Sequence, residues 1–283
     1  MKLAILGGDR RAALLAGLLL RDGQRLQSFA LERAELPEEI PRAVHLQAAV
    51  YGADAVILPL PVEKGGLLNA PYARLPCRTE ELMDALWPGQ IVFGGMFSER
   101  LRQQAVSQGL QLVDWMQRPG FVIGNAALTA EGAVGLLLQE SERSLSGSRV
   151  LVSGFGRIGR LLANKLQALG AAVTVAARRE ESRAEAEALG YTALPFGALS
   201  GAFDYVVNTV PERVLDESFL CCLPDTALLL ELASAPGGYD RNLAENLGLR
   251  CLAAPGLPGR SAPLAAAELL RREFYQAIKE EQE

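Results

Sequence analysis

The sequence contains a single histidine, His45, among its 283 residues. One histidine excludes multi-histidine metal sites and paired histidine acid and base groups, and no catalytic motif surrounds His45. The four cysteines show no Cys-x-x-Cys spacing, which argues against a redox motif or a zinc site built on that spacing. We therefore expect no metal ion and reduced thiols, as in a cytosolic protein.

Long apolar runs and an excess of basic residues are also missing. No run of about 20 apolar residues occurs, so we expect no membrane-spanning helix. Charged residues at 9–11 interrupt the apolar start of the chain, so we expect no secretory signal. The formal net charge of −5 argues against nucleic acid as a partner, because DNA binding needs a basic surface. These absences favour a cytoplasmic protein that binds small molecules.

Strand-like and helix-like segments alternate along the whole chain, with short apolar runs such as 3–6 and 150–153 before helical spacing. This alternation is typical of an α/β fold, with a parallel sheet covered by helices on both faces. The length fits two domains of roughly 150 residues each. We predict two Rossmann-like, doubly wound parallel-sheet domains with an interdomain cleft. Their expected ranges are 1–125 for a flavodoxin-like, substrate-side domain, 126–260 for a dinucleotide-binding domain, and 261–283 for a C-terminal helix that packs back on the first domain.

The strongest motif is a glycine fingerprint that directly follows the apolar run 150–153. Gly154, Gly156 and Gly159 form a G-x-G-x-x-G pattern that opens a helical segment. In dinucleotide-binding domains the first glycine permits a tight turn, the second lets the backbone approach a pyrophosphate, and the third lets helix and strand pack closely. The amides at the helix start, including those of Arg157 and Ile158, then hold the anion. The alternative is a glycine-rich turn without a ligand.

The next strand ends in Arg178 and Arg179, where an enzyme that uses NAD commonly has a carboxylate for the ribose 2′-hydroxyl. A guanidinium group pairs with a 2′-phosphate in fork geometry, so the sequence favours NADP, with NAD possible. Two alternatives stay open for these arginines. They either solvate the strand end or pair there with Glu180 and Glu181, or they stack on adenine without contacting a phosphate.

Further strand ends should meet at the same crevice, because ligands bind beyond the carboxyl ends of parallel strands. Thr209, Val210 and Pro211 follow one strand and are expected beside the adenosine half of the cofactor. Ala233 and Ser234 follow a later strand and are expected nearer the nicotinamide. For each of these residues, turn formation is the alternative role.

The same residues resemble a known family. The segments 233–240 (Ala-Ser-Ala-Pro-Gly-Gly-Tyr-Asp) and 254–259 (Ala-Pro-Gly-Leu-Pro-Gly) are similar to paired signatures of the dipicolinate synthase A subunit. Three further segments also resemble that family, so the resemblance spans nearly the whole chain. They are Gly7-Gly8-Asp9, the fingerprint with Arg157 inside it, and a group of residues before the long helical segment. The final group consists of Asn125, Thr129, Glu131 and Gly132.

This resemblance implies an oxidoreductase of sporulation. With a flavoprotein-like B subunit, it would oxidise a dihydrodipicolinate-type precursor, derived from 4-hydroxy-tetrahydrodipicolinate, to pyridine-2,6-dicarboxylate. The A subunit would be the dehydrogenase-like partner that binds NAD or NADP, in a hetero-oligomer in the cytoplasm of the mother cell. The alternatives are another dehydrogenase or reductase of a small carboxylate, and a non-catalytic nucleotide-binding subunit.

The lack of a catalytic histidine fits this implied reaction. A hydroxyacid dehydrogenase must remove a hydroxyl proton and commonly uses histidine for it. A dihydropyridine loses a hydride and a proton to become aromatic, so the driving force lies in the substrate. The protein then mainly holds the two rings face to face, and this proximity alone lowers the activation barrier by several kcal/mol.

The remaining candidates are polar residues in the segments just described. A dicarboxylate calls for cations or N–H donors, for which the sequence offers Arg260 and Arg11. Asn125 and Thr129 are expected where the chain crosses between the domains, a usual place for a substrate. Thr129 with Glu131 is equally explained as the N-terminus of a helix over 129–143. The candidates for orienting the substrate or moving a proton are Ser234, Asp240 and Glu131.

Overall fold

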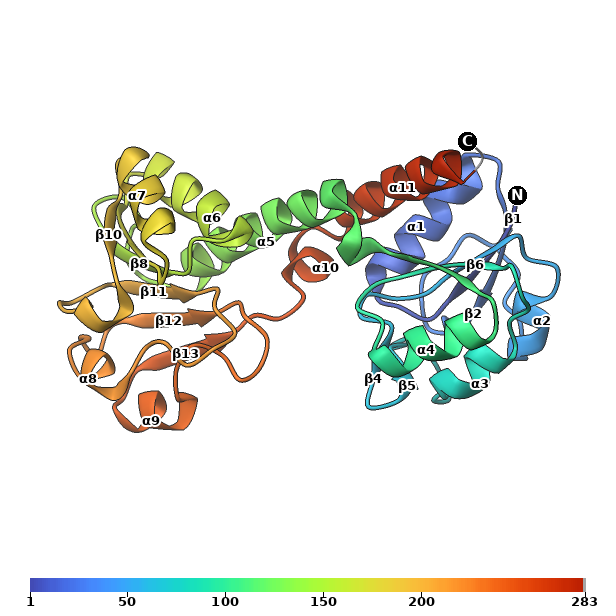
Figure 1. Cartoon of the computed structure of the whole chain (residues 1–283), viewed down its shortest axis with the longest axis horizontal. Coiled ribbons are helices and arrows are strands. Elements are labelled where there is room, and N and C mark those ends of the chain that lie inside the picture. The colour runs from blue at the N-terminus through green and yellow to red at the C-terminus, as the bar shows by residue number, and fades with distance from the viewer. Residues whose placement is uncertain (282–283) are drawn as a thin grey trace. The chain divides into compact units, whose positions relative to one another are not determined.

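The computed structural model of the chain describes residues 1–281 and divides into two compact units (Figure 1). Unit 1 consists of Met1–Asn125 together with the described residues from Ala262 onward, and unit 2 consists of Ala126–Ser261. Each unit contains a parallel sheet with helices on its faces. This arrangement confirms the predicted α/β fold with two Rossmann-like, parallel-sheet domains.

The sheet of unit 1 has the strand order β2-β1-β3-β6-β7, with every neighbouring pair parallel. Leu3 to Leu6 of β1 are buried on both faces, as expected for an interior strand of a parallel sheet. The elements of unit 1 are β1 (Lys2–Leu6), α1 (Arg10–Arg21), β2 (Arg25–Phe29), α2 (Leu46–Val50), β3 (Ala55–Ile57), β4 (Glu63–Lys64), β5 (Leu67–Leu68), α3 (Thr79–Asp84), β6 (Ile91–Gly94), α4 (Glu99–Ser107), β7 (Gln111–Asp114), a 3-10 helix (Trp115–Gln117), the first residues of α5 (Pro119–Glu140), and α11 (Pro263–Glu280).

Helix α11 returns to unit 1 after the chain has passed through unit 2. It lies along α1, and Phe274 of α11 packs on Phe93 of β6 with ring centroids 5.0 Å apart. Phe93 in turn stacks on Trp115, also at 5.0 Å. The C-terminal helix expected within 261–283 thus corresponds to α11, while residues 282 and 283 lie outside the described residues.

The sheet of unit 2 has the order β10-β9-β8-β11-β12-β13, also parallel throughout. Because β9 and β11 flank β8, the loops that follow these three strands share one edge of the sheet. The elements are the rest of α5, β8 (Arg149–Ser153), α6 (Arg157–Ala168), β9 (Ala172–Ala176), α7 (Glu180–Ala188), β10 (Thr192–Leu194), a 3-10 helix (Phe196–Ala198), β11 (Tyr205–Asn208), α8 (Glu217–Leu220), β12 (Leu228–Glu231), α9 (Arg241–Asn246), β13 (Arg250–Ala253) and α10 (Leu257–Ser261).

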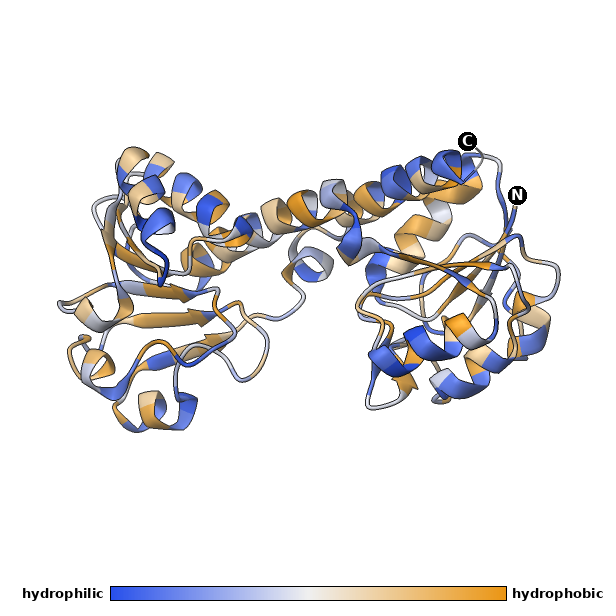
Figure 2. Cartoon of the chain, viewed as in Figure 1, coloured by the Kyte–Doolittle hydropathy of each residue, from blue (hydrophilic) through white to orange (hydrophobic). Residues whose placement is uncertain are grey.

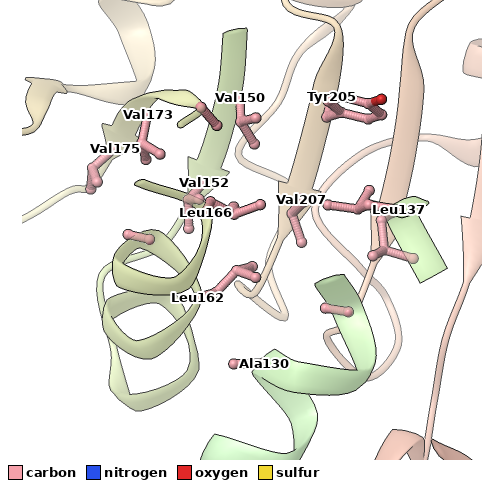
Figure 3. Close-up of a cluster of buried hydrophobic side chains, with 14 of the residues drawn as sticks. Ala130, Leu137, Val150, Val152, Leu162, Leu166, Val173, Val175, Tyr205 and Val207 are labelled. Atoms are coloured by element: carbon pink, nitrogen blue, oxygen red, sulfur yellow. The ribbon is translucent and has the colours of Figure 1, made fainter. Parts of the chain in front are cut away.

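Side chains of four helices (α5, α6, α7 and α10) and of several strands form the core of unit 2 on one face of the sheet, part of which Figure 3 shows. Leu162 and Leu166 of α6 lie against Val150 and Val152 of β8, and Leu137 of α5 lies near Val207 of β11. Figure 2 shows the matching pattern of hydropathy, with apolar strands β12 and β13 and helices that alternate apolar and polar residues. This core holds β8 and α6, and therefore the glycine fingerprint between them, in a fixed geometry.

Helix α5 begins at Pro119 and not near Thr129, where the sequence pattern predicts its start, so Thr129 lies inside the helix. The helix N-terminus predicted for Thr129 and Glu131 is therefore wrong. By length and composition α5 is the one helix in residues 1–281 that could cross a membrane. That is weak evidence for a membrane span, since Ala130, Ala133 and Leu137 are fully buried in the core of unit 2.

Candidate dinucleotide site

The loop between β8 and α6 depends on two glycines for its own packing. Gly154 has φ of +97° and donates its N–H to the carbonyl of Ala176 on β9 over 2.8 Å. A Cβ at Gly154 would come within 2.8 Å of Val210 Cγ2, and a Cβ at Gly159 would overlap the carbonyl oxygen of Gly154. Both positions therefore need glycine whether or not a ligand binds.

Gly156 differs from both, because the protein itself gives no reason for glycine there. Its φ of −84° suits any L-residue, and a Cβ would meet nothing within 4 Å. Gly156 is also the N-cap of α6. Because glycine has no side chain, it makes no capping hydrogen bond to the first turn, in which exposed Arg157 and half-buried Ile158 lie. The result is an open cradle of N–H donors at the positive end of a helix, which fits the pyrophosphate of a dinucleotide.

The turn after β9 presents Arg178 and Arg179 to solvent. Arg183 of α7 fixes this turn by donating from Nη1 to the carbonyls of Ala177 and Arg178, at 2.9 and 2.7 Å. Arg178 pairs with Glu212, whose Oε2 lies 3.3 Å from Nη1, and not with Glu180 or Glu181. The structure thus places a guanidinium group beside the fingerprint, with a carboxylate next to it.

The segment after β11 supplies the other wall of this edge. Thr209 Oγ1 donates to the carbonyl of Ser153 over 2.8 Å and so ties β11 to β8 just before the fingerprint. Val210 is half-buried and its side chain faces Gly154, while Pro211 is exposed. Thus the fingerprint, Arg178, Thr209 and Val210 are brought together at one edge of unit 2.

A row of polar side chains crosses the same edge, and motif analysis missed it. Ser153, Asn208 and Glu231 end the neighbouring strands β8, β11 and β12 in register. Ser153 Oγ lies 2.8 Å from Asn208 Oδ1, and Asn208 Nδ2 donates to Glu231 Oε1 over 2.7 Å. Each of the three strands ends in a polar residue after an apolar run, which is the sequence signal that could have revealed the row.

Glu231 holds the loop that contains Ala233 and Ser234. Its Oε1 accepts the N–H of Ala233 at 2.9 Å, and its Oε2 accepts the N–H of Gly238 at 2.8 Å. Burial raises the pKa of the Glu231 carboxyl, although the hydrogen bonds from Gly238, Asn208 and Ala233 favour the charged form. Ala233 is half-buried within this clamped loop, whereas Ser234 is exposed.

The two carboxylates predicted to move protons have partners of their own. Asp240 is the N-cap of α9, where Oδ1 accepts the N–H of Leu243 at 3.2 Å, and its Oδ2 pairs with Arg213 Nη1 at 2.6 Å. The hydrogen bond from Arg213 holds the pKa of Asp240 below its ordinary value. Glu131 is exposed on α5, with Oε1 3.7 Å from Lys165 Nζ. Each of the two carboxylates thus faces a cationic side chain of the protein.

The candidates for substrate binding fall into both units. Arg260 is exposed on α10, the short helix that contains the second half of the 254–259 signature. Thr129 is buried in the part of α5 that belongs to unit 2, and Asn125 is the last residue of the first segment of unit 1. Both make interactions within the protein.

Arg11 lines a pocket within unit 1, at the carboxyl ends of β1 and β3. Its side chain is 9% exposed and pairs with Asp9, with Nη2 2.8 Å from Asp9 Oδ2 and 2.8 Å from the carbonyl of Leu60. The pocket wall also includes Pro59, Trp115 and Leu270. Over residues 1–281, no group of three or more His, Cys, Asp or Glu side chains could hold a metal ion.

Comparison with known proteins agrees with this geometry. Residues 2–116 match the family of the N-terminal domain of the dipicolinate synthase A subunit. Residues 128–247 match the NAD-binding domain of D-isomer-specific 2-hydroxyacid dehydrogenases. The second match contains the fingerprint, Arg178, Thr209 and Glu231.

Full-length relatives extend the match to the whole chain. The dipicolinate synthase A subunit of Bacillus subtilis (strain 168) is 29% identical, over 99% of this chain and 96% of that protein. The crystal structure of the dipicolinate synthase A chain from Bacillus subtilis superposes with a TM-score of 0.86 at 27% identity, covering 100% of this chain and 97% of that one. The crystal structure of the A subunit from Bacillus halodurans gives 0.85 at 26% identity, covering 98% and 97%. The chain is therefore similar along its whole length to dipicolinate synthase A subunits, and it is an oxidoreductase with a nicotinamide-dinucleotide-binding domain.

Proposed function

We propose that this chain oxidises a dihydrodipicolinate-type precursor, derived from 4-hydroxy-tetrahydrodipicolinate, to pyridine-2,6-dicarboxylate. The observation that carries the proposal is the open space at Gly156, over the uncapped first turn of α6. Nothing in the protein's own packing requires glycine there, whereas the approach of a pyrophosphate does. The similarity to dipicolinate synthase A subunits along both units supports the choice of substrate.

The cofactor we propose is NADP, with NAD as the second choice. Gly154, Gly156, Arg157, Ile158 and Gly159 would hold the pyrophosphate, and the exposed Arg178 and Arg179 would face the ribose 2′-phosphate. Thr209, Val210, Pro211 and Ala233 would line the rest of the bound dinucleotide. When bound, the cofactor supplies a hydride acceptor, and the substrate becomes aromatic once a proton has also left the ring.

The protein's own part in this reaction is to bind and orient a small diacid. Arg260 and Arg11 are the proposed cations for its carboxylates, and Asn125 and Thr129 the proposed neutral contacts. The Asp9–Arg11 pair lowers the net charge available at Arg11, so the exposed Arg260 offers the stronger attraction. Ser234, Asp240 and Glu131 stay the predicted proton-transfer residues, and of these Ser234 lies in the loop that Glu231 clamps.

We further propose that the chain works with a flavoprotein-like B subunit in a hetero-oligomer, in the cytoplasm of the sporulating mother cell. This proposal follows only from the similarity to dipicolinate synthase A subunits. Stoichiometry would follow from native mass measurements on the co-purified complex.

The test is an assay of product formation. The purified chain is incubated with freshly made 4-hydroxy-tetrahydrodipicolinate and NADP⁺, with and without the B subunit, while the ultraviolet absorbance of dipicolinate is followed. We expect absorbance to rise when the chain and NADP⁺ are both present and to stay flat when either is left out. A flat trace with and without the B subunit, from a chain that binds NADPH, would favour another small carboxylate as substrate.

A further inference from the structure

The ion pair between Arg178 and Glu212 joins two loops that are not neighbours in the sheet. Arg178 follows β9 and Glu212 follows β11, and β8 lies between these strands. Arg178 Nη1 lies 3.3 Å from Glu212 Oε2. The pair therefore bridges the carboxyl end of β8, where the loop with Gly154 and Gly156 begins.

This pair supplies the carboxylate that the turn after β9 lacks. In a Rossmann-type domain, the group that distinguishes NAD from NADP commonly lies in that turn. Here the turn contains Arg178 and Arg179, and the nearest acidic partner comes from the segment after β11. A cation and an anion thus lie side by side where the adenosine ribose of a bound dinucleotide belongs.

The ion pair between Arg178 and Glu212 can separate easily. The side chains of Arg178 and Glu212 are 77% and 62% exposed, and ion pairs this exposed are weak because water and salt screen them. The backbone beneath Arg178 is held by Arg183, so only the arginine side chain needs to move. A ligand group that offers either residue a better partner can therefore separate them.

We propose that Glu212 and Arg178 together set the preference for the group on the ribose C2′ carbon. A 2′-phosphate would draw Arg178 away from Glu212 and be repelled by the Glu212 carboxylate. A 2′-hydroxyl would donate to Glu212 while the ion pair stays closed. Glu212 thus reduces the preference for NADP over NAD that the arginines produce. As a result, the site binds both dinucleotides. This inference rests on the dinucleotide site of the proposed function.

The experiment compares the full-length chain with three variants, Glu212→Gln, Arg178→Gln and the control Glu245→Gln. Glu245 pairs with Arg241 on α9 at 2.7 Å, a similarly exposed pair. Dissociation constants for NADPH and for NADH are measured by isothermal titration calorimetry, so that no turnover is needed. Repeating the titrations at two salt concentrations shows which contacts are ionic.

For Glu212→Gln we expect tighter NADPH binding and weaker NADH binding, so that their ratio shifts by about tenfold towards NADPH. Arg178→Gln should weaken NADPH binding about tenfold, leave NADH nearly unchanged and reduce the salt dependence of NADPH binding. Glu245→Gln should match the wild type for both ligands.

Two outcomes overturn the inference, and they differ from a failure of the proposed function. If Glu212→Gln shifts the ratio of dissociation constants no more than Glu245→Gln does, Glu212 takes no part in selection. If Arg178→Gln binds NADPH as tightly as the wild type, the 2′-group lies elsewhere. If the wild-type chain binds neither nucleotide, the dinucleotide site itself is wrong.

Discussion

At the scale of single residues, the three fingerprint glycines answer to different constraints. Gly154 needs a positive φ, and Gly159 needs the absence of a Cβ because the Gly154 carbonyl occupies that space. Both constraints act on the free protein, so substitution there affects stability. Gly156 has ordinary dihedral angles and open space, so substitution there affects whatever enters that space.

The first prediction separates folding from binding within this loop. Gly156→Val should change the free energy of unfolding by less than about 1 kcal/mol, since only a helix cap position changes. It should also abolish the rise in melting temperature that NADPH produces. Gly159→Ala should cost at least about 2 kcal/mol, because backbone must move. Urea denaturation and thermal melts with and without NADPH measure both effects.

The control is Gly197→Val, at a glycine that also has nothing within 4 Å of a built Cβ. It should keep both the stability and the response to NADPH. Survival of the NADPH response in Gly156→Val would mean that the pyrophosphate does not bind at α6.

The second prediction concerns Glu231. Burial raises its pKa, so the folded state holds this proton more tightly than the unfolded state does. The carboxyl therefore destabilises the fold progressively as pH rises from its unfolded value of about 4.5 through the raised folded value. Urea unfolding of the wild type and of Glu231→Gln, from pH 4.5 to pH 7.5, should show this falling component in the wild type alone. Parallel curves would count against the raised pKa.

The Glu231 row shows why part of the site escaped sequence analysis. Ser153, Asn208 and Glu231 are far apart in the chain, and only the register of β8, β11 and β12 brings them together. The fingerprint, in contrast, is local, because strand, glycines and helix follow one another directly. Local turn chemistry is readable from spacing, whereas a hydrogen-bond network across strands depends on strand order.

At the scale of whole elements, α11 is fastened to α1 by a small polar cluster. Asp22, the C-cap of α1, accepts from Arg271 Nε at 2.6 Å and from the Tyr275 hydroxyl at 3.0 Å. The hydrogen bond from Arg271 holds the pKa of Asp22 below its ordinary value. Beneath the cluster, Phe274 packs on Phe93, so polar and apolar contacts both fix the helix.

The third prediction is that acid and Asp22→Asn loosen α11 in the same way. Because the pKa of Asp22 is lowered in the folded state, its carboxylate stabilises the docked helix at any pH above its ordinary pKa of 3.8. This stabilisation is lost as the pH falls through the lowered pKa of the folded state. Asp22→Asn should therefore raise amide hydrogen exchange along 263–280 at neutral pH. Glu268→Gln, on the exposed side of α11, should leave exchange unchanged. Equal exchange in the two variants would show that apolar packing alone holds α11.

The misplaced start of α5 has a physical cause at this same scale. Glycine inside a segment usually argues against a helix, and Gly120 and Gly124 follow closely after Pro119. The sequence pattern therefore did not indicate that the helix begins at Pro119, although proline is common at the first position of a helix. In the structure these glycines make room for α11, since a Cβ at Gly120 would lie 2.6 Å from Glu273 Oε1 and one at Gly124 would lie 2.8 Å from Leu269 Cδ1. Tertiary packing thus overrides local propensity in α5, which sequence spacing cannot reveal.

At the scale of the whole molecule, the alternation of strands and helices was enough to predict both parallel sheets. The residues proposed to hold the dinucleotide all belong to the contiguous segment Ala126–Ser261. Unit 1, in contrast, combines two separate stretches of the sequence and contains Arg11 and Asn125. The proposed dinucleotide contacts therefore lie in one unit, whereas the proposed diacid contacts come from both, with Arg260 and Thr129 in unit 2.

The fourth prediction follows from this division. Saturating NADPH should slow amide hydrogen exchange in peptides from unit 2, most strongly around 153–160 and 176–180, because ligand binding stabilises the unit that binds. Peptides from β1, β3 and β6 should exchange at unchanged rates. Exchange mass spectrometry of the full-length chain measures both regions at once. Protection concentrated in unit 1 would contradict the assignment of the site.

The position of α11 also matters while the protein is being made. The ribosome releases β1 to β7 first, then all of unit 2, and only afterwards the helix that covers Phe93. At typical elongation rates this delay is roughly ten seconds, during which the apolar surface around Phe93 lacks the cover that Phe274 provides. All of unit 2 is therefore translated before the last segment of unit 1, so the half of the protein that is begun first is completed last.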